Sequence, residues 1–250
     1  MSQPPTSSSG EALLSARGIV LSFGATKVLH GVDFSVRSGE AVGVVGPNGA
    51  GKTTLLAALS GSLSVAAGTV QLGGRDVTGL DAARRCRLGV ARSHQVPRPF
   101  GGMTVFENVL TAAMHGGGVN RSRAYEKSVD ALSVCGMLPV ANRRAETLGL
   151  LERKRLELTR ALATDPRLLL LDEIGGGLTD GEAAELVSTI GLLRSRGITI
   201  VWIEHIVHLL VQVTERLVCM DAGTIIADGS PSEVLSDARV VEAYLGGQRA

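Results

Sequence analysis

The chain has 250 residues, of which 44% are hydrophobic and 20% are charged, and its formal net charge is +1 at pH 7. Such a chain can bury a substantial core, as one large α/β domain or one with a subdomain, whereas its balanced charge argues against a nucleic-acid-binding surface made by bulk charge. No run approaches the roughly 18 apolar residues that a membrane span needs. We expect residues 1–12 to be a flexible N-terminal tail, because they are rich in Ser and Pro and lack the apolar stretch of a signal peptide.

The basic and thiol side chains give no sign of a separate site. The densest basic stretches, Arg84-Arg85 and Arg153-Lys154-Arg155, are short, and we expect them to be solvated faces of turns or helices. The cysteines Cys86, Cys135 and Cys219 occur singly, without metal-ligand spacing. Their odd number fits a reducing cytoplasm.

Residues 16–72 contain short β patterns around a glycine-rich loop. Residues 40–45 are a buried-strand pattern, and residues 52–63 are a helix pattern rich in Leu and Ala. Between them lies a complete G-x-x-x-x-G-K-[ST] motif, the Walker A phosphate-binding loop. The loop consists of Gly46, Pro47, Asn48, Gly49, Ala50, Gly51, Lys52 and Thr53, and we assign the next residue, Thr54, to the same nucleotide site.

The residue types of this loop suit a nucleoside triphosphate. Glycines allow successive N–H groups to point at phosphate oxygens, and the following helix adds the positive end of its dipole. Lys52 can reach the β and γ phosphates, and the Thr53 hydroxyl can ligate the Mg²⁺ that bridges them. A chance glycine-rich turn is a poor alternative, because a strand, a helix and a second motif accompany the loop.

The next segments lead from a strand into a mostly helical stretch. A β pattern over residues 88–93 precedes Gln95, and Pro97 and Pro99 end regular structure there. A glutamine at a strand end can contact both a metal and water, although plain polar termination of a strand is common. Residues from about 96 to 163 have helical periodicity, which predicts a helical subdomain inserted in the core, itself formed by residues 13–95 and 164–247.

A second motif occupies residues 168–173, where four leucines end in Asp172 and Glu173. A short apolar run after a turn is typical of a central parallel strand, whose carboxyl end is where ligands bind in open α/β sheets. We expect Asp172 to hold the metal, as the acid of a Walker B strand does, and Glu173 to orient and polarise the attacking water. The alternative is that the two acids merely end a core strand.

An α/β pattern returns after the second motif. Thr179-x-x-Glu182 and Ser230-Pro231-x-Glu233 are capping-box sequences, which predict helix starts. Residues 198–203 predict a second buried strand. His205 follows this strand, which we expect to lie next to the Walker B strand. Its imidazole could then donate a hydrogen bond to a γ-phosphate. A hairpin is predicted with its turn at Asp221-Ala222-Gly223.

From about residue 13 to residue 247, the order of these motifs resembles that of ABC transporter ATP-binding subunits, most closely the branched-chain (hydrophobic) amino acid uptake type. Further matching stretches are Leu21-Ser22-Phe23-Gly24, Met103 to Val109 after Gln95, Gly177-Leu178-Thr179, Glu204-His205 and Asp228-Gly229-Ser230-Pro231. The resemblance implies an α/β P-loop NTPase fold with a RecA-like core, an antiparallel β subdomain and a helical subdomain.

The resemblance also implies ligands and roles. ATP and Mg²⁺ would be the cofactors, with Phe23 stacked on adenine and the metal held by Thr53, Gln95 and Asp172. Gln95 would couple the site to a membrane subunit, Glu173 would be the catalytic base, and His205 would sense the γ-phosphate. Hydrolysis would power an importer of branched-chain amino acids. Urea, amides or other small polar solutes stay open as alternatives.

The partners implied by the resemblance are membrane permease subunits, a second ABC ATPase subunit and, indirectly, a solute-binding protein, with no nucleic acid. The chain would then be cytoplasmic and peripheral on the inner face of the cell membrane.

One motif departs from the family pattern. Where ABC ATPases carry an LSGGQ-like signature, Leu148 is followed by Gly149, Leu150, Leu151 and Glu152. In the family, the signature brings backbone N–H groups, a serine hydroxyl and a helix N-terminus onto the γ-phosphate held by the opposite subunit. Leu150 and Leu151 should obstruct that approach, and Gly149 lacks the hydroxyl. The alternative is that the backbone around Gly149 shifts and takes the place of the missing glycines.

The sequence therefore favours an asymmetric heterodimer, in which this chain's own phosphate loop is active and the partner's loop is impaired, while a homodimer stays open. Two other functions compete with transport. A soluble ABC ATPase of DNA repair or translation would need coiled-coil insertions or tandem cassettes, for which 250 residues leave no room. A non-catalytic subunit conflicts with the presence of Glu173 and His205.

Overall fold

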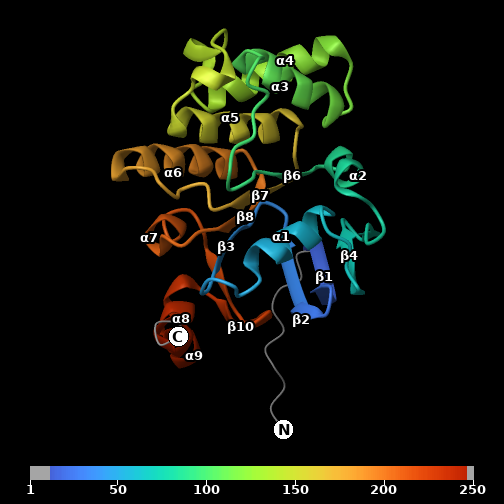
Figure 1. The fold of residues 1–250 in the computed structure, drawn as a ribbon, viewed down its shortest axis with the longest axis vertical. Coiled ribbons are helices and arrows are strands. Elements are labelled where there is room, and N and C mark those ends of the chain that lie inside the picture. The colour runs from blue at the N-terminus through green and yellow to red at the C-terminus, as the bar shows by residue number, and fades with distance from the viewer. Residues whose placement is uncertain (1–11, 247–250) are drawn as a thin grey trace.

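A six-stranded sheet in the order β10-β9-β3-β8-β7-β6 forms the centre of the computed structural model, which describes residues 12–246 (Figure 1). Its strands are β3 (Ala41–Val45), β6 (Val90–Arg92), β7 (Leu168–Asp172), β8 (Thr199–Ile203), β9 (Arg216–Asp221) and β10 (Thr224–Gly229). Neighbouring strands are parallel, except that β10 is antiparallel to β9. Every residue of β3, β7 and β8 is buried, as expected for largely apolar strands covered on both faces.

Alternate residues of the central strands enter two separate hydrophobic cores. Leu170 joins the core that contains α1 (Lys52–Ser60), whereas Leu171 joins the core that contains α5 (Leu150–Ala163) and α6 (Asp180–Ser195). Successive side chains of a strand point to opposite faces, so one apolar run serves both cores. In Figure 1, α1 and α6 accordingly lie on different sides of the sheet.

A second, fully antiparallel sheet has the order β2-β1-β4-β5. Its strands are β1 (Ala12–Phe23), β2 (Thr26–Arg37), β4 (Ala67–Leu72) and β5 (Arg75–Asp76). Residues 1–11 of the predicted tail lie outside the described residues. Ala12 was wrongly assigned to that tail, because its backbone pairs with Arg37 and begins β1.

Helices form a separate group above the six-stranded sheet in Figure 1. This group consists of α3 (Val105–His115), α4 (Arg121–Val134) and α5, with short 3-10 turns at Leu138–Val140 and Ala145–Thr147. The remaining helices are α2 (Ala82–Arg87), α7 (Val207–Leu210), α8 (Pro231–Ser236) and α9 (Ala238–Gly246). None of the helices within residues 12–246 combines the length and the hydropathy that a membrane span requires.

Local sequence signals set several helix ends. The two predicted capping boxes are confirmed at the starts of α6 and α8. A third begins α3, where the Thr104 hydroxyl accepts from the N–H of Glu107 and the Glu107 carboxylate accepts from the N–H of Thr104. Helix α1 ends at Ser60, earlier than the predicted end at Leu63, because Gly61 takes a left-handed φ of 75° and closes the helix.

The predicted hairpin is confirmed as the pair β9 and β10. Ala222 has φ 42° and Gly223 has φ 76°, so a two-residue turn with two left-handed residues joins the strands. The hairpin completes one edge of the six-stranded sheet.

The prediction that both basic stretches are solvated is wrong for Arg85 and for Lys154, which are buried. The Arg85 side chain is 1% exposed, and its Nη1 donates to the carbonyl oxygens of Ala58 at 2.8 Å and Leu59 at 2.9 Å, near the end of α1. The last carbonyl groups of a helix have no partner within it. Arg85 therefore caps the end of the helix that begins at the phosphate loop.

Replacing Arg85 with alanine is expected to lower the free energy of unfolding by about 3 kcal/mol, because several buried carbonyl groups lose a charged donor. Urea denaturation followed by circular dichroism measures the change. The neighbouring Arg84 is exposed, and Arg84→Ala is the matched control, expected to change stability by less than about 0.5 kcal/mol. Equal effects of the two substitutions would contradict the capping role of Arg85.

Candidate functional site

The phosphate-binding loop connects the carboxyl end of β3 to the start of α1. Gly46 has φ 142°, and a Cβ atom at this position would lie 2.1 Å from the carbonyl oxygen of Met220, so β9 passes too close for any side chain. Gly51 has φ 97° and directly precedes α1. Because the first N–H groups of a helix have no partner within it, this geometry presents them to an anion at the loop.

The Lys52 side chain lies across the loop and is 5% exposed. Its Nζ atom donates to the carbonyl oxygens of Gly46 at 2.7 Å and Pro47 at 2.9 Å. Burial lowers the pKa of Lys52, while the nearby Glu173, Cys219 and Asp172 act in the opposite direction. The ammonium group is therefore held at the position where the loop would bind phosphate.

The two Walker motifs meet through Thr53 and Asp172. Thr53 Oγ1 donates to Asp172 Oδ1 at 3.1 Å, although the residues are 119 positions apart in the sequence. The other carboxylate oxygen, Oδ2, accepts from Arg92 Nη2 at 2.7 Å. Asp172 is 2% exposed, so Arg92 balances a buried carboxylate.

Arg92 was not predicted as a site residue. It occupies the last position of β6, next to β7. A single arginine within the β pattern of residues 88–93 was the only sequence signal, and only the adjacency of the two strands links it to Asp172.

The three residues predicted to be catalytic lie together at the carboxyl edge of the sheet. His205 Nε2 lies 2.6 Å from Glu173 Oε1, and Gln95 Nε2 donates to Glu173 Oε2. The predicted adjacency of the strands before Glu173 and His205 is confirmed, since Asp172 pairs with Ile203 across β7 and β8. Glu173 itself has φ 48°, an uncommon conformation for a residue with a side chain.

A cavity of about 320 Å³ lies beside the phosphate loop. Phe23, at the end of β1, and Val28 form part of its wall, together with residues 48–54 and Glu173. The Phe23 side chain is 52% exposed, so its ring is accessible from the cavity. The cavity thus joins an aromatic face, a phosphate-binding loop and a carboxylate.

The signature-like residues lie elsewhere in the described chain. Helix α5 begins at Leu150 with Gly149 at its N-cap, and the N–H of Gly149 donates to Glu152 Oε2 at 3.0 Å. Leu150 is 50% exposed, and Leu151 follows it in the first turn. In residues 12–246, none of these four residues lines the cavity at the phosphate loop.

Tyr244, on α9, is a contact to the loop that the sequence did not reveal. Its hydroxyl oxygen accepts a hydrogen bond from the N–H of Gly46 at 2.8 Å. Burial raises the pKa of Tyr244, and the bond from Gly46 acts in the opposite direction. A residue 198 positions away from Gly46 therefore supports the first residue of the loop.

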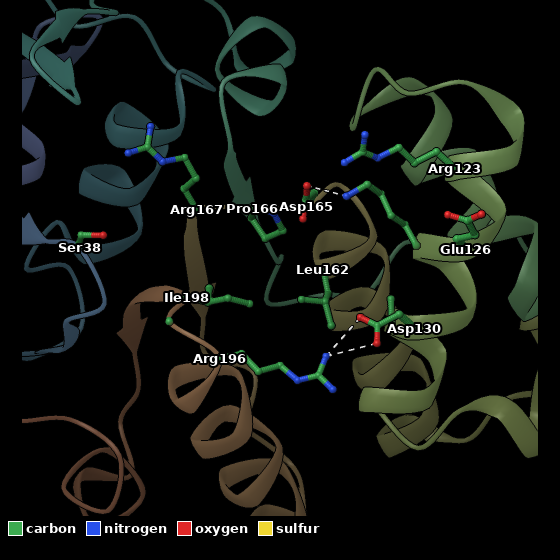
Figure 2. A pocket seen from close by; sticks show the side chains of 13 residues that line it. Ser38, Arg123, Glu126, Asp130, Leu162, Asp165, Pro166, Arg167, Arg196 and Ile198 are labelled. Atoms are coloured by element: carbon green, nitrogen blue, oxygen red, sulfur yellow. Dashed lines mark hydrogen bonds and ion pairs between the residues drawn. The ribbon is translucent and has the colours of Figure 1, made fainter.

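A larger cavity, of about 590 Å³, lies at the opposite edge of the sheet, next to the residues that precede β7 and β8. Two ion pairs lie across it, one between Lys127 and Asp165 and one between Arg196 and Asp130 at 3.2 Å. Figure 2 shows the pair of Arg196 and Asp130. Because these charges are already paired, and because the phosphate loop is at the other edge, this cavity is not the nucleotide site.

Comparisons with known proteins identify the family of the chain. Residues 29–175 match the ABC transporter family, and residues 224–250 match the branched-chain amino acid ATP-binding cassette transporter family. The chain is 35% identical to the high-affinity branched-chain amino acid transport ATP-binding protein LivG of Salmonella typhimurium, over 98% of this chain and 99% of that protein. It is 33% identical to BraF of Pseudomonas aeruginosa, described by the same function, over 94% and 98% of the two chains.

Solved structures show the same fold. A nucleotide-free ATP-binding cassette from an ABC transporter superposes with a TM-score of 0.86 at 31% identity, covering 94% of this chain and 99% of that one. The ADP conformation of an ATP-binding cassette of an ABC transporter gives the same values. The expected P-loop NTPase fold is therefore confirmed. The chain belongs to the ABC transporter family, as an ATP-binding subunit that hydrolyses ATP to power transport.

Proposed function

We propose that this subunit powers an importer of branched-chain amino acids from the inner face of the cell membrane. The observation that carries the proposal is the meeting of Thr53, Asp172, Glu173 and His205 at one edge of the sheet, beside the cavity at the phosphate loop. The relatives LivG and BraF, both described as branched-chain amino acid transport proteins, support the choice of solute and favour transport over DNA repair or translation.

ATP would lie along the cavity from Phe23 to Glu173. The ring of Phe23 offers a face for adenine, and the N–H groups of the loop between residues 48 and 54 would surround the phosphates. Lys52 would exchange its contacts to Gly46 and Pro47 for phosphate oxygens, because an ammonium group is attracted more strongly to an anion than to a carbonyl.

The residues beside the loop fit Mg²⁺, which prefers oxygen ligands. Thr53 Oγ1 and Asp172 Oδ1 lie 3.1 Å apart, and Gln95 adds an amide oxygen near the same edge. Arg92 binds the other oxygen of Asp172, which keeps Oδ1 directed towards Thr53. When bound between these ligands and the phosphates, the ion would neutralise part of the phosphate charge.

Glu173 would orient the attacking water and take up its proton. Its carboxylate already contacts His205 and Gln95, so a small shift of either side chain would free an oxygen for water. His205 would then form a hydrogen bond with the γ-phosphate. Gln95 would couple the nucleotide site to the permease. These roles agree with the positions of the side chains at adjacent strand ends.

The family implies association with membrane permease components. We place the docking surface at a cleft of about 340 Å³ lined by residues of α2, α3, β6 and α5. Close to Gln95 in the sequence, the chain exposes two large apolar side chains, Val96 at 65% and Phe100 at 47%, and Arg160 of the cleft lies over the Phe100 ring. Exposed apolar side chains beside a cleft suit a protein partner, and Gln95 would connect that partner to Glu173.

The signature of this chain would serve a partner's nucleotide poorly. The N–H of Gly149 is engaged by Glu152, and Leu150 projects from the first turn of α5, where the family has glycine. Glu152 adds a negative charge that Arg143 balances at 2.8 Å. We therefore propose a heterodimer, in which the partner completes this chain's site but receives an impaired signature in return.

Reconstitution into proteoliposomes with the permeases, the second ATPase subunit and the solute-binding protein tests the proposed function. ATP inside the vesicles is expected to drive uptake of labelled leucine, and Lys52→Ala should abolish it. Uptake of urea or an amide without leucine would overturn the choice of solute. An ATPase stimulated by DNA or ribosomes, with no uptake, would overturn the transport function.

Replacing Tyr244 with phenylalanine is expected to raise the KM for ATP about fivefold with little change in kcat. The substitution keeps the ring but removes the acceptor for the N–H of Gly46. The loss of this hydrogen bond is expected to destabilise the binding conformation of the loop by about 1 kcal/mol. Steady-state ATPase kinetics measures both constants. Tyr125 is 56% exposed on α4, and Tyr125→Phe is the matched control, expected to leave both unchanged. An unchanged KM for Tyr244→Phe would contradict the role.

A further inference from the structure

The loop that follows the second Walker motif contains three consecutive glycines, Gly175, Gly176 and Gly177. It connects Glu173, which directly follows β7, to Thr179, the N-cap of α6. Glycine loses more backbone freedom on ordering than any other residue, so this stretch is intrinsically adaptable. The position of Glu173 therefore depends on what holds the loop.

One of the groups that hold it is Lys154, which is 5% exposed on α5. Its Nζ atom donates to the carbonyl oxygen of Ile174 at 3.0 Å and to that of Gly176. Burial lowers the pKa of Lys154, whereas Glu204 and Glu173 act in the opposite direction. A buried ammonium group is unfavourable unless it is fully bonded, so its contacts to this loop are specific.

The second group is Glu204, which is 1% exposed and directly follows β8. Its Oε1 atom accepts the N–H of Gly175, and its Oε2 atom accepts the N–H of His205 at 3.2 Å. A Cβ atom at Gly175 would lie 2.7 Å from Glu204 Oε1, so a side chain there would displace the Glu204 carboxylate from the N–H of Gly175. Burial raises the pKa of Glu204, while the bonds from Gly175 and His205, and the charge of Lys154, oppose that rise.

We propose that Lys154 and Glu204 are positioning residues that hold the glycine loop, and through it the carboxylate of Glu173. The two opposite charges bind the loop's carbonyl oxygens and one of its N–H groups. Glu204 also binds the N–H of His205, whose ring contacts Glu173. The inference rests on the proposed role of Glu173 in hydrolysis.

This arrangement connects three parts of the fold. Lys154 comes from α5, which is the helix of the upper group nearest to α6 and the sheet in Figure 1. Glu204 comes from the end of β8, and the loop itself begins at β7. Because Glu173 has a left-handed φ of 48°, its backbone can relax once the loop that follows it is released.

Lys154→Met is the first test, made in the reconstituted transporter. The substitution keeps the length of the side chain but removes the donor, so kcat for ATP hydrolysis is expected to fall at least about tenfold. The dissociation constant for ATP, measured in the presence of Mg²⁺, should change less than about twofold, since Lys154 does not line the phosphate cavity. An unchanged kcat overturns the proposal.

Glu204→Gln is a second variant, which tests the proposal if Lys154→Met fails to fold. Glutamine has nearly the same shape as glutamate but carries no charge. Its amide can accept the N–H of Gly175 through one oxygen only, and it leaves Lys154 without its opposing charge. Hydrogen exchange at the N–H groups of residues 174–177 is expected to accelerate about tenfold or more, together with the loss of kcat. Unchanged exchange and unchanged kcat in this variant also overturn the proposal.

A rescue experiment separates positioning of the loop from general stability. Gly176→Ala should restore part of the kcat lost in Lys154→Met, because a Cβ atom there has ordinary contacts and alanine stiffens the loop. Gly181→Ala, on α6 in open space, is the matched control and should not restore kcat. Equal rescue by both contradicts the role in positioning.

These outcomes are distinct from a failure of the proposed function. If Glu173 has no part in hydrolysis, Glu173→Gln leaves turnover intact. If only the positioning role is wrong, Glu173→Gln still abolishes turnover, while Lys154→Met and Glu204→Gln do not change it.

Discussion

Replacing Lys52 with alanine is expected to weaken ATP binding by about 100-fold or more and to abolish hydrolysis. The ammonium group is buried within the loop and would make charged hydrogen bonds to the phosphates, each with a stabilisation of about 1.5–3 kcal/mol. Titration with a fluorescent ATP analogue measures the binding, and phosphate release measures the turnover.

The matched control for Lys52→Ala removes one exposed positive charge that does not line the cavity at the phosphate loop. Arg75, on β5 of the antiparallel sheet, is exposed, and Arg75→Ala should leave the affinity for ATP unchanged. Retention of both binding and turnover by Lys52→Ala would remove the basis for assigning the nucleotide to this loop.

Replacing Glu173 with glutamine is expected to lower kcat by about 10²–10⁴-fold while ATP remains bound. A carboxylate that aligns water and accepts its proton contributes about that factor, and glutamine keeps the shape but cannot accept the proton. His205 lies 2.6 Å from one oxygen of this carboxylate, and a small shift of His205 would free that oxygen for water. Phosphate release in the reconstituted pair measures kcat, and filter binding with labelled ATP measures retention.

The same substitution tests the proposed asymmetry of the heterodimer. Glu173→Gln should remove nearly all of the ATPase activity of the pair, whereas the equivalent change in the partner should remove little, because in the proposed heterodimer the partner's nucleotide would face Leu150 and Leu151. Equal losses would refute the asymmetry. Glu126, which is exposed on α4, provides the control, and Glu126→Gln should leave turnover unchanged.

Contiguous motifs could be predicted because their geometry is local. The loop from Gly46 to Thr53 needs only a preceding strand and a following helix, and both were evident from apolar patterns. The capping boxes at Thr179 and Ser230 could likewise be predicted, since each bonds residues three positions apart. The assembly of Glu173 with His205 followed from a general rule, that parallel strands end at the same edge of a sheet.

Contacts between distant segments could not be predicted from such patterns. Arg92, Tyr244 and Lys154 meet the site from β6, α9 and α5, and nothing around each residue signals a partner 80, 198 or 20 positions away. The burial of Arg85 and Lys154 was mispredicted for the same reason. A charged residue in a short basic stretch is usually solvated, and only the arrival of helix carbonyls or a glycine loop makes burial favourable.

By itself, the sequence determined that this chain binds a nucleoside triphosphate at a Walker A loop and carries an acid pair at the end of a buried strand, since both depend on neighbouring residues. The tertiary structure alone decided which charged groups surround those motifs. The physical reason is that a buried charge is stable only beside groups that bond it, and such groups come from segments that are brought together by the packing of the sheet and its helices.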